Sequence, residues 1–281
     1  MDTQTLPAPA APARPAENRL VSRTYGGINW LGLQTLVARE VQRFMKVSAQ
    51  TVIAPLTSTV LFLSIFAALL GARHWGVTEA VPYINGLVPG LAMMAIISNA
   101  FQNSASSLII AKVQGNAVDF LMPPISALEL TIAFLAGSAA RGLIVGLASV
   151  LIAAPFADIV PVNWFAALYF ALMGAIVFGA IGLIGGIWAD KFDHLAAVTN
   201  FIVTPLTMLS GTFFSVAVLP EPARTISHYN PVFFLIDGFR AGFIGHADTS
   251  LWVSGAISGA LAAALCFTCW SLLKSGWRLK A

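Results

Sequence analysis

The residues of this sequence with the most chemical potential are charged side chains inside apolar stretches. The segment NPVFFLIDGFRAGFIG, residues 230–245, is rich in phenylalanine but holds Asp237 and Arg240. An aspartate and an arginine three residues apart on a helix are close enough to pair. As a helix the segment would extend only about 24 Å, less than the roughly 30 Å of a bilayer hydrocarbon core. We therefore predict a charged helix that is too short to span a membrane.

Residues that cap helices mark both ends of this segment. Asn230 is a good N-cap, Pro231 suits the first helical position, and Gly245 suits the position after the last one. One apolar face consists of Val232, Ile236, Phe239 and Phe243. We expect this face to contact lipid or neighbouring helices. The charged pair should lie on another face, where water can reach it.

Arg141 is a charge near the middle of a long apolar stretch, residues 130–153. On insertion scales an arginine in that position costs about 2.5–3.5 kcal/mol. We therefore expect its side chain to face the protein interior or a water-filled cavity. Two roles fit that position: Arg141 binds an anionic group on a substrate, or it caps the carbonyl groups of a broken neighbouring helix.

Other reactive residue types give little indication of catalysis. Cys266 and Cys269 have the spacing of a redox or metal motif, but both fall in an apolar stretch without a second pair, so we interpret them as packing residues. The four histidines are scattered, which argues against a metal site. The sequence has no GxxxxGK[ST] phosphate loop and no HExxH, GxSxG or kinase signature. We expect no metal, no catalytic site and no phosphate-loop ATP hydrolysis on this chain.

The composition places these residues in a membrane protein. Of 281 residues, 58% are hydrophobic and 10% are charged, whereas a soluble domain has about 25% charged residues. The predicted fold is an all-α integral membrane protein with six transmembrane helices. The second and fifth spans contain Pro89 and Pro205, and a proline disturbs a helix interior. The expected spans lie near 51–70, 86–108, 130–153, 164–187, 196–218 and 251–273.

The chain ends and the loops indicate the orientation. Residues 1–27 are rich in Ala and Pro and have no apolar core, so we predict a disordered cytoplasmic tail before one transmembrane domain at 28–281. With the N-terminus inside, eleven Lys and Arg residues lie on the cytoplasmic side and three on the external side. This difference predicts that both termini are cytoplasmic. Basic residues at the chain ends suit a membrane surface better than nucleic acid.

Residues 29–47 form an element of their own before the first span. Their pattern predicts an amphipathic helix in the membrane interface, with Arg39, Arg43 and Lys46 away from the apolar face. A simple extension of the first span is the alternative. The apolar residues that recur at three- and four-residue steps are Trp30, Leu33, Val37, Val41 and Phe44.

Two predicted cytoplasmic loops carry apolar side chains that spanning does not require. The apolar patch around Phe120 in residues 111–130 is of the kind that usually marks a contact surface. In residues 189–195, Phe192 is likewise an apolar residue among charged ones. The alternative is that the first loop is an ordinary connector. The candidate contact residues are Lys112, Gln114, Gly115, Asp119, Phe120, Leu121, Met122, Pro123 and Pro124 in the first loop, and Asp190, Lys191, Phe192 and Asp193 in the second.

The energy source of such a protein is not on this chain. Acidic residues deep in the predicted spans are absent, which weakens the case for a proton- or sodium-coupled transporter. A membrane protein of this kind either receives energy from a partner protein or needs none. Two other classes stay open: a lipid-modifying membrane enzyme, which would want clustered His, Asp or Glu near one interface, and an assembly scaffold.

Four runs together resemble a known family. In order they are QGNAVDFLMPPISALEL, GSAARGLIVG, LTMLSGTFFSVAVLP and the segment at 230–245. They are similar to the permease subunit of type-2 ABC exporters, especially the bacterial YadH-like branch and its relatives, the nodulation-factor exporter permeases of the NodJ type. The resemblance covers about residues 29–281. The long Pro/Ala tail departs from the family pattern.

The resemblance also implies the other subunits of an exporter complex. It implies a dimer of permease copies in the bacterial inner membrane, each bound to a separate cytoplasmic ATPase that carries ATP and magnesium, with no cofactor on this chain. The helix at 29–47 and the loop at 112–124 would dock on the ATPase, and short re-entrant helices before the last span would close the exit. The implied external gate consists of Asn230, Pro231, Asp237, Gly238, Phe239 and Arg240.

The predicted function is a permease subunit that moves a substrate out of the cytoplasm or the inner leaflet. The family implies a lipid, glycolipid, polysaccharide or drug. The short outer loops leave no room for a large binding domain, and the apolar surroundings favour an amphipathic substrate.

The topology yields the first testable prediction. A cysteine placed at Asp158 or His246 should react with an impermeant thiol reagent added outside intact cells, because both positions lie in external connections. A cysteine at Gln114 or Lys191 should react only after the membrane is opened. Labelling of Gln114 in intact cells would contradict six spans with cytoplasmic termini.

Overall fold

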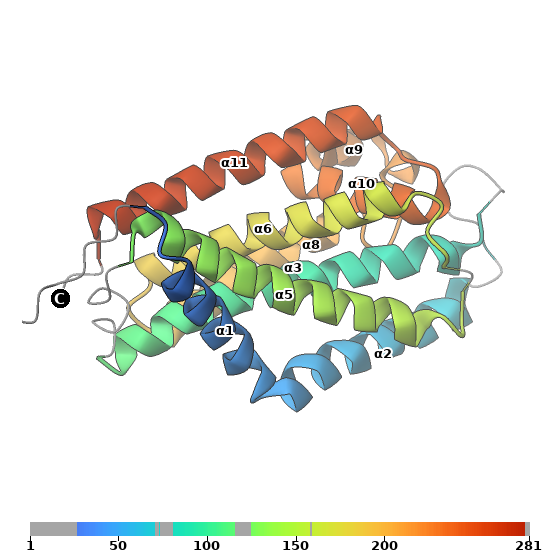
Figure 1. The fold of residues 1–281 in the computed structure, drawn as a ribbon. Helices are drawn as coiled ribbons and strands as arrows, with labels where there is room; N and C mark the ends of the chain where they lie inside the picture. Colours follow the sequence, from blue (N-terminus) through green and yellow to red (C-terminus); the bar gives the residue numbers. More distant parts are fainter. Residues whose placement is uncertain (1–26, 71–72, 74–80, 116–124, 158, 279–281) are drawn as a thin grey trace, which may run out of the picture.

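The computed structural model describes residues 27–70, 73, 81–115, 125–157 and 159–278, which form helices and no β-strand. Most of the long helices run side by side in one bundle (Figure 1). The end at which α3 and α11 finish is called the proximal end, and the opposite end the distal end. In chain order the elements are α1 (Trp30–Met45), η1 (Ala49–Ile53), α2 (Ala54–Leu70), α3 (Tyr83–Val113), α5 (Ala127–Ala153), α6 (Trp164–Trp188), α7 (Phe192–Val198), η2 (Thr199–Val203), α8 (Thr204–Leu209), η3 (Val216–Val218), α9 (Glu221–Tyr229), α10 (Pro231–Ile244) and α11 (Leu251–Ser275).

Five helical segments within the described residues are long and apolar enough to cross a membrane. Each contains one predicted span, so five of the six spans are confirmed. α5 starts at a capping box, in which Ser126 Oγ accepts a hydrogen bond from the Glu129 amide and the Glu129 carboxylate accepts one from the Ser126 amide. The five segments are Ala49–Leu70, Tyr83–Val113, Ala127–Ala153, Trp164–Trp188 and Leu251–Ser275.

The sixth predicted span, 196–218, has different boundaries. The succession α7, η2 and α8 begins at Phe192 and ends at Leu209. The chain then turns at Gly211, whose φ of 81° is a left-handed conformation that favours glycine. Counting this uninterrupted succession as one span agrees with six. The expectation that the helix continues to residue 218 is wrong.

Both π-helical stretches come just before a proline. η1 precedes Pro55 and η2 precedes Pro205. A proline ring clashes with the carbonyl four residues earlier, which belongs here to Thr51 and to Phe201. Both carbonyls lie inside the π-helical stretches, where the wider turn relieves this clash.

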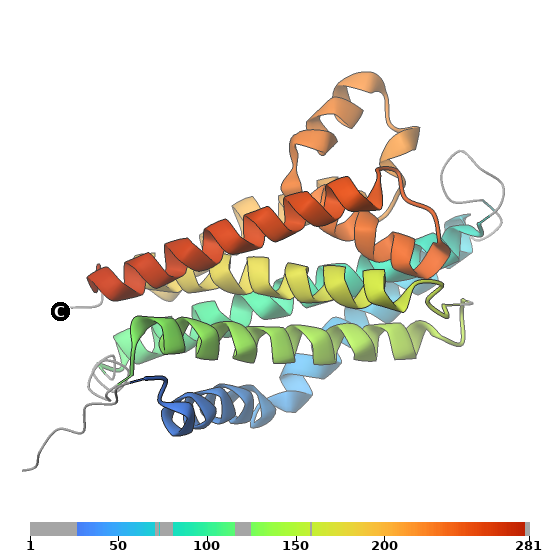
Figure 2. The same cartoon turned by 45° about the horizontal axis from the view of Figure 1, so that its top comes forward.

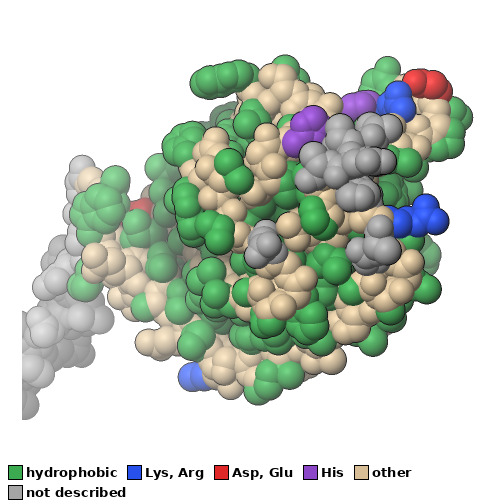
Figure 3. Space-filling model, turned by 90° about the vertical axis from the view of Figure 1, so that its right-hand side faces the viewer, with side chains coloured by type: hydrophobic (Ala, Val, Ile, Leu, Met, Phe, Trp, Pro, Cys, Tyr) green, Lys and Arg blue, Asp and Glu red, His purple; other side chains and the backbone are tan. Residues whose placement is uncertain are grey.

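α3 is the central helix of the bundle and packs against α5, α6 and α10. Its most apolar window is 78% buried, against 11% for the segment with α2 and 22% for α11. Seen from the distal end, hydrophobic side chains dominate the outline of the bundle (Figure 3). Such a large exposed apolar surface requires lipid around it.

The segment between α8 and α11 differs from the rest of the bundle. In Figure 2 the part that holds η3 and α9, drawn in orange, stands out from the long helices at the distal end, while α10 returns into them. α10 has 14 residues and is therefore about 21 Å long. Short helices were predicted before the last span, and α9 (Glu221–Tyr229) and α10 confirm them as elements.

The amphipathic helix at 29–47 is confirmed as α1, and part of its apolar face packs against the bundle. The buried residues are Leu33, Leu36, Glu40 and Phe44. Trp30 is 64% exposed, so this part of the predicted apolar face does not pack against the bundle. Arg43 is also not on the outer side, since its guanidinium reaches α3.

Glycines let two pairs of helices approach closely. On α6 a Cβ at Gly186 would meet Leu108 of α3 at 3.0 Å, as the small-residue spacing in α6 suggests. On α10 a Cβ at Gly242 would lie 2.6 Å from the backbone nitrogen of Ala167 in α6. Gly238, one turn earlier, faces the ring of Phe170 in the same way. α10 is therefore seated on α6 through a glycine face.

This contact predicts opposite effects of two glycine substitutions. Gly242→Ala should lower the free energy of unfolding by about 1–3 kcal/mol, because the backbone of Ala167 cannot yield. Gly255→Ala on α11 is the matched control: its Cβ would lie 3.8 Å from Tyr169, and the change should be neutral or stabilising by about 0.5–1 kcal/mol. Unfolding in detergent measures both. Equal stability of the two variants would contradict a close α6–α10 contact.

Candidate functional site

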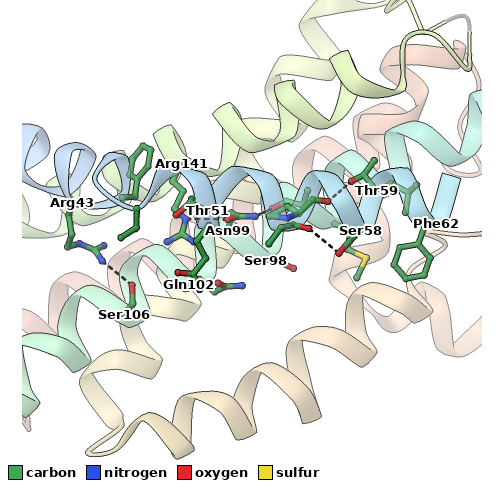
Figure 4. Close-up of a pocket in the computed structure, with 18 of the residues that line it drawn as sticks. Arg43, Thr51, Ser58, Thr59, Phe62, Ser98, Asn99, Gln102, Ser106 and Arg141 are labelled. Atoms are coloured by element: carbon green, nitrogen blue, oxygen red, sulfur yellow. Dashed lines mark hydrogen bonds between the residues drawn. The ribbon is translucent and has the colours of Figure 1, made fainter. Parts of the chain in front are cut away.

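A polar cleft lies between α2 and α3 and has a volume of about 620 Å³. α1 and η1 close its proximal side, and α5 contributes Arg141 (Figure 4). No Asp or Glu occurs among the described residues that line it. The polar lining side chains are Arg43, Gln50, Thr51, Ser58, Thr59, Ser98, Asn99, Gln102, Ser106 and Arg141.

Arg141 lies where the sequence places it, inside the protein and beside a cavity. It is 9% exposed. Its Nε donates a hydrogen bond to Asn99 Oδ1 at 3.3 Å, and Asn99 Nδ2 donates in turn to the Ala95 carbonyl at 3.0 Å. An amide oxygen on α3 thus orients the guanidinium within the cleft.

A polar cluster holds α1 against α3 at the proximal end of the cleft. Arg43 donates to the Asn103 carbonyl at 2.8 Å and to Ser106 Oγ at 3.0 Å. It also pairs with Glu40 at 3.0 Å, and Glu40 accepts a hydrogen bond from Ser107 Oγ at 2.7 Å. The sequence analysis missed this cluster. Glu40 follows Leu33 and Leu36 on the buried face, and that spacing is the one signal that could have placed it.

Lys112 joins the proximal ends of two spanning helices. It lies in the last turn of α3, and its Nζ donates to the carbonyls of Ile187 at 2.7 Å and Ala189 at 2.8 Å at the end of α6. These are carbonyls that a helix C-terminus leaves without an intrahelical partner. Asp190 lies 3.6 Å from Lys112 Nζ and 3.8 Å from Arg278 Nη1.

The remaining candidate loop residues are divided by what the structure describes. Gln114 is the C-cap of α3, and Gly115 has a φ of 73°. Lys191 is the N-cap of α7, Phe192 is exposed, and Asp193 lies in the first turn of that helix. The first loop's other candidates lie outside the described residues; they are Asp119, Phe120, Leu121, Met122, Pro123 and Pro124.

The predicted caps of the segment at 230–245 are confirmed. Asn230 Oδ1 accepts a hydrogen bond from the Val232 amide at 3.0 Å, and Pro231 is the first residue of α10. Gly245 ends the helix with a φ of 70°. Asn230 Nδ2 also donates to the Leu206 carbonyl at 2.9 Å, which ties the start of α10 to α8.

The two charges of α10 bind different backbone segments. Asp237 accepts hydrogen bonds from the amides of Asp248 at 2.9 Å and Thr249 at 3.0 Å. Arg240 donates to the carbonyl of Gly86 on α3 at 3.2 Å and to that of Gly211. Both α10 side chains are buried, at 1% and 2% exposed. The expectation that water reaches this pair is wrong, because the charges are satisfied by backbone groups inside the protein.

The predicted apolar face of α10 is confirmed as a protein contact. All four of its residues belong to the main core cluster. Phe239 and Phe243 lie with ring centroids 5.0 Å apart, and Gly238 gives the ring of Phe170 room to approach. This face therefore contacts neighbouring helices.

The cysteines behave as packing residues in the structure. Cys269 is buried and its thiol donates to the Ala180 carbonyl at 3.4 Å, while Cys266 is half-buried; both are free thiols. Within the described part of the chain no group of three His, Cys, Asp or Glu residues could hold a metal ion. The polar groups that the described residues present in the cleft are amides, hydroxyls and guanidinium groups, beside apolar side chains such as Phe44 and Leu91.

The backbone contacts of α10 predict local effects of two substitutions. Asp237→Ala should speed hydrogen exchange at residues 245–250, because two amides there lose their acceptor. Arg240→Ala should speed it at residues 210–213 instead. Each change should cost roughly 3–5 kcal/mol, the usual cost of breaking a buried charged contact.

Arg224→Ala on α9 is the control, because an exposed pair with Glu221 contributes only about 0.2–1 kcal/mol. Hydrogen-exchange mass spectrometry measures all three variants. Identical exchange patterns for Asp237→Ala and Arg240→Ala would contradict separate anchoring.

Comparison with known proteins identifies the family of this arrangement. Residues 32–244 match the family model described as ABC-2 type transporter. The chain is 34% identical to the inner membrane transport permease YadH of Escherichia coli K12 over 252 residues, which are 90% of this chain and 98% of that protein. It is 26% identical over 219 residues to the nodulation protein J of Sinorhizobium fredii, covering 77% and 81% of the two chains. The chain belongs to the ABC-2 type transporter family.

Proposed function

We propose that this chain is the permease subunit of an ATP-driven exporter in a bacterial inner membrane. It moves an amphipathic substrate from the cytoplasm or the inner leaflet outward, and a separate cytoplasmic ATPase supplies the energy. The proximal end is the cytoplasmic end, so both termini face the cytoplasm. The names of relatives support this proposal, since the YadH protein is an inner membrane transport permease.

The observation that carries the proposal is the polar cleft inside an apolar bundle. A protein that only has to span lipid gains little from the Arg141 guanidinium and several amides and hydroxyls facing a cavity of about 620 Å³. Polar groups at membrane depth are costly, and they typically mark the path of a substrate or ion. One wall of the cleft is α2, which is the least buried of the long helices. A substrate has access to such a cleft from the membrane.

The proximal end supports coupling to an ATPase. Lys112, Asp190 and Arg278 connect the ends of α3, α6 and α11. A displacement of one of these helix ends would therefore move the other two. α1 is also joined to α3 through Arg43. An ATPase that docks on α1 and on the loop after α3 would act directly on the two walls of the cleft.

A second permease copy completes the proposed machine. The segment with α2 leaves most of its apolar surface uncovered, and Ile53 and Leu61 are more than half exposed. A second copy against this side would enclose the cleft between two subunits. The two copies would each carry one ATPase, with ATP and magnesium bound on the ATPase.

The coupling loop gives the prediction for this function. Phe120→Asp should reduce both transport and co-purification of the ATPase, because it places a charge in a predicted apolar contact. Insertion should be unchanged, since the predicted site lies outside lipid. Phe156→Asp is the matched control. Phe156 follows α5 at the distal end and is exposed, so the same substitution there should leave co-purification intact.

Two outcomes would count against this proposal. If Phe120→Asp binds the ATPase and transports as well as the unmodified chain, the loop is only a connector. If no ATPase co-purifies with the unmodified chain, and no substrate stimulates ATP turnover, a scaffold or a membrane enzyme takes its place.

A further inference from the structure

We infer that the cleft binds the anionic oxygen group of an amphiphile, such as a phosphate or carboxylate headgroup, and that Arg141 is its principal contact. This inference rests on the proposed function, because it names the class of substrate that the cleft takes.

The first observation is a charge without a counter-charge. Two guanidinium groups, those of Arg43 and Arg141, line the cleft, and no acidic side chain does so among the described lining residues. Glu40 lies behind this surface and pairs with Arg43. No described residue forms an ion pair with Arg141, so one positive charge faces the cavity.

The second observation is an unused set of donors. Among the described residues, the Arg141 side chain makes one hydrogen bond, from Nε to Asn99. Its two terminal nitrogens carry four further N–H groups in the planar arrangement that suits a carboxylate or phosphate. Donors inside an apolar bundle usually find acceptors, and a bound oxyanion would supply them.

The third observation is that the cleft changes character along its length. Arg43 and Ser106 lie at its proximal end, and Phe62 lies at the other end (Figure 4). Leu91 and Met94 line the cleft about one to two helical turns before Ser98 on α3, toward the distal end. An amphiphile fits this order, with its anionic group at the arginines and apolar chain against the distal wall. A small soluble anion would leave that wall uncovered.

The test measures binding to the purified full-length permease chain in detergent, without an ATPase. Three probes are titrated: dioleoylphosphatidylglycerol, dioleoylphosphatidylcholine with the same acyl chains, and inorganic phosphate. Native mass spectrometry counts the bound lipid, and competition with the bound phosphatidylglycerol reports phosphate binding. The expected result is about tenfold tighter binding of the anionic lipid than of the zwitterionic one, the effect of one charge-assisted hydrogen bond.

Substitutions locate this preference in the cleft. Arg141→Gln should remove the difference between the two lipids, and Arg141→Lys should keep part of it. Gln102→Glu, which adds an acidic group to the cleft, should weaken binding of the anionic lipid alone. The matched controls are Arg39→Gln and Gln34→Glu on the exposed side of α1, outside the cleft, and neither should change the ratio.

The outcomes are decisive in both directions. A folded Arg141→Gln variant that keeps the full lipid preference would overturn the inference. If that variant does not fold, an undiminished preference in Gln102→Glu would overturn it instead. Inorganic phosphate that binds as tightly as the anionic lipid would overturn the assignment to an amphiphile. Each of these results leaves ATPase co-purification unaffected, so failure here is distinct from failure of the proposed function.

Discussion

A guanidinium group inside an apolar bundle has to find its acceptors in the protein, because lipid offers none. This constraint shapes three parts of the molecule. Arg240 takes two backbone carbonyls and thereby fixes α10 between α3 and the turn after α8. Arg43 takes a carbonyl and a hydroxyl of α3 and thereby fixes α1. Arg141 takes one amide oxygen. The first two arginines hold helices in place, whereas the terminal N–H groups of Arg141 have no acceptor among the described residues.

α3 is the element that all three of these contacts share. It supplies the Gly86 carbonyl at its distal end, Asn99 in its middle, and the Asn103 carbonyl nearer its proximal end. Its last turn supplies Lys112 to the end of α6. A displacement of α3 would therefore change contacts at both membrane surfaces and in the cleft at once. Of the five long segments among the described residues, α3 has the most buried apolar window, and it is the helix that connects the sites.

The sequence predicts much of this fold because lipid imposes a simple rule on composition. Stretches without charge must be helices of a certain length, and five spans follow from that rule. Local capping chemistry likewise places α10, since Asn230 and Gly245 act on their immediate neighbours. The end of α8 is less predictable. Apolar residues continue past Leu209, and the turn depends on Gly211 and its surroundings rather than on polarity.

The candidate site was predicted less well because its key contacts join distant residues. Nothing near Arg240 in the sequence indicates that carbonyls of Gly86 and Gly211 would accept its hydrogen bonds. Glu40 was not among the predicted site residues, yet it accepts a hydrogen bond from Ser107 across the contact between α1 and α3. Only Arg141 was placed correctly beside a cavity, because the cost of a charge at that depth permits few other positions.

The carboxylate of Asp190 lies between Lys112 and Arg278 and connects the residues that follow α11 to the ends of α3 and α6. Arg278 also donates to the carbonyl of Trp188 at 2.6 Å. A reporter or affinity tag attached after Ala281 leaves these contacts in place. Truncation that removes Arg278 takes away a basic partner of Asp190 and frees the end of α11 from the end of α6. A chain shortened to end at Arg278 would still contain both residues of each of these contacts.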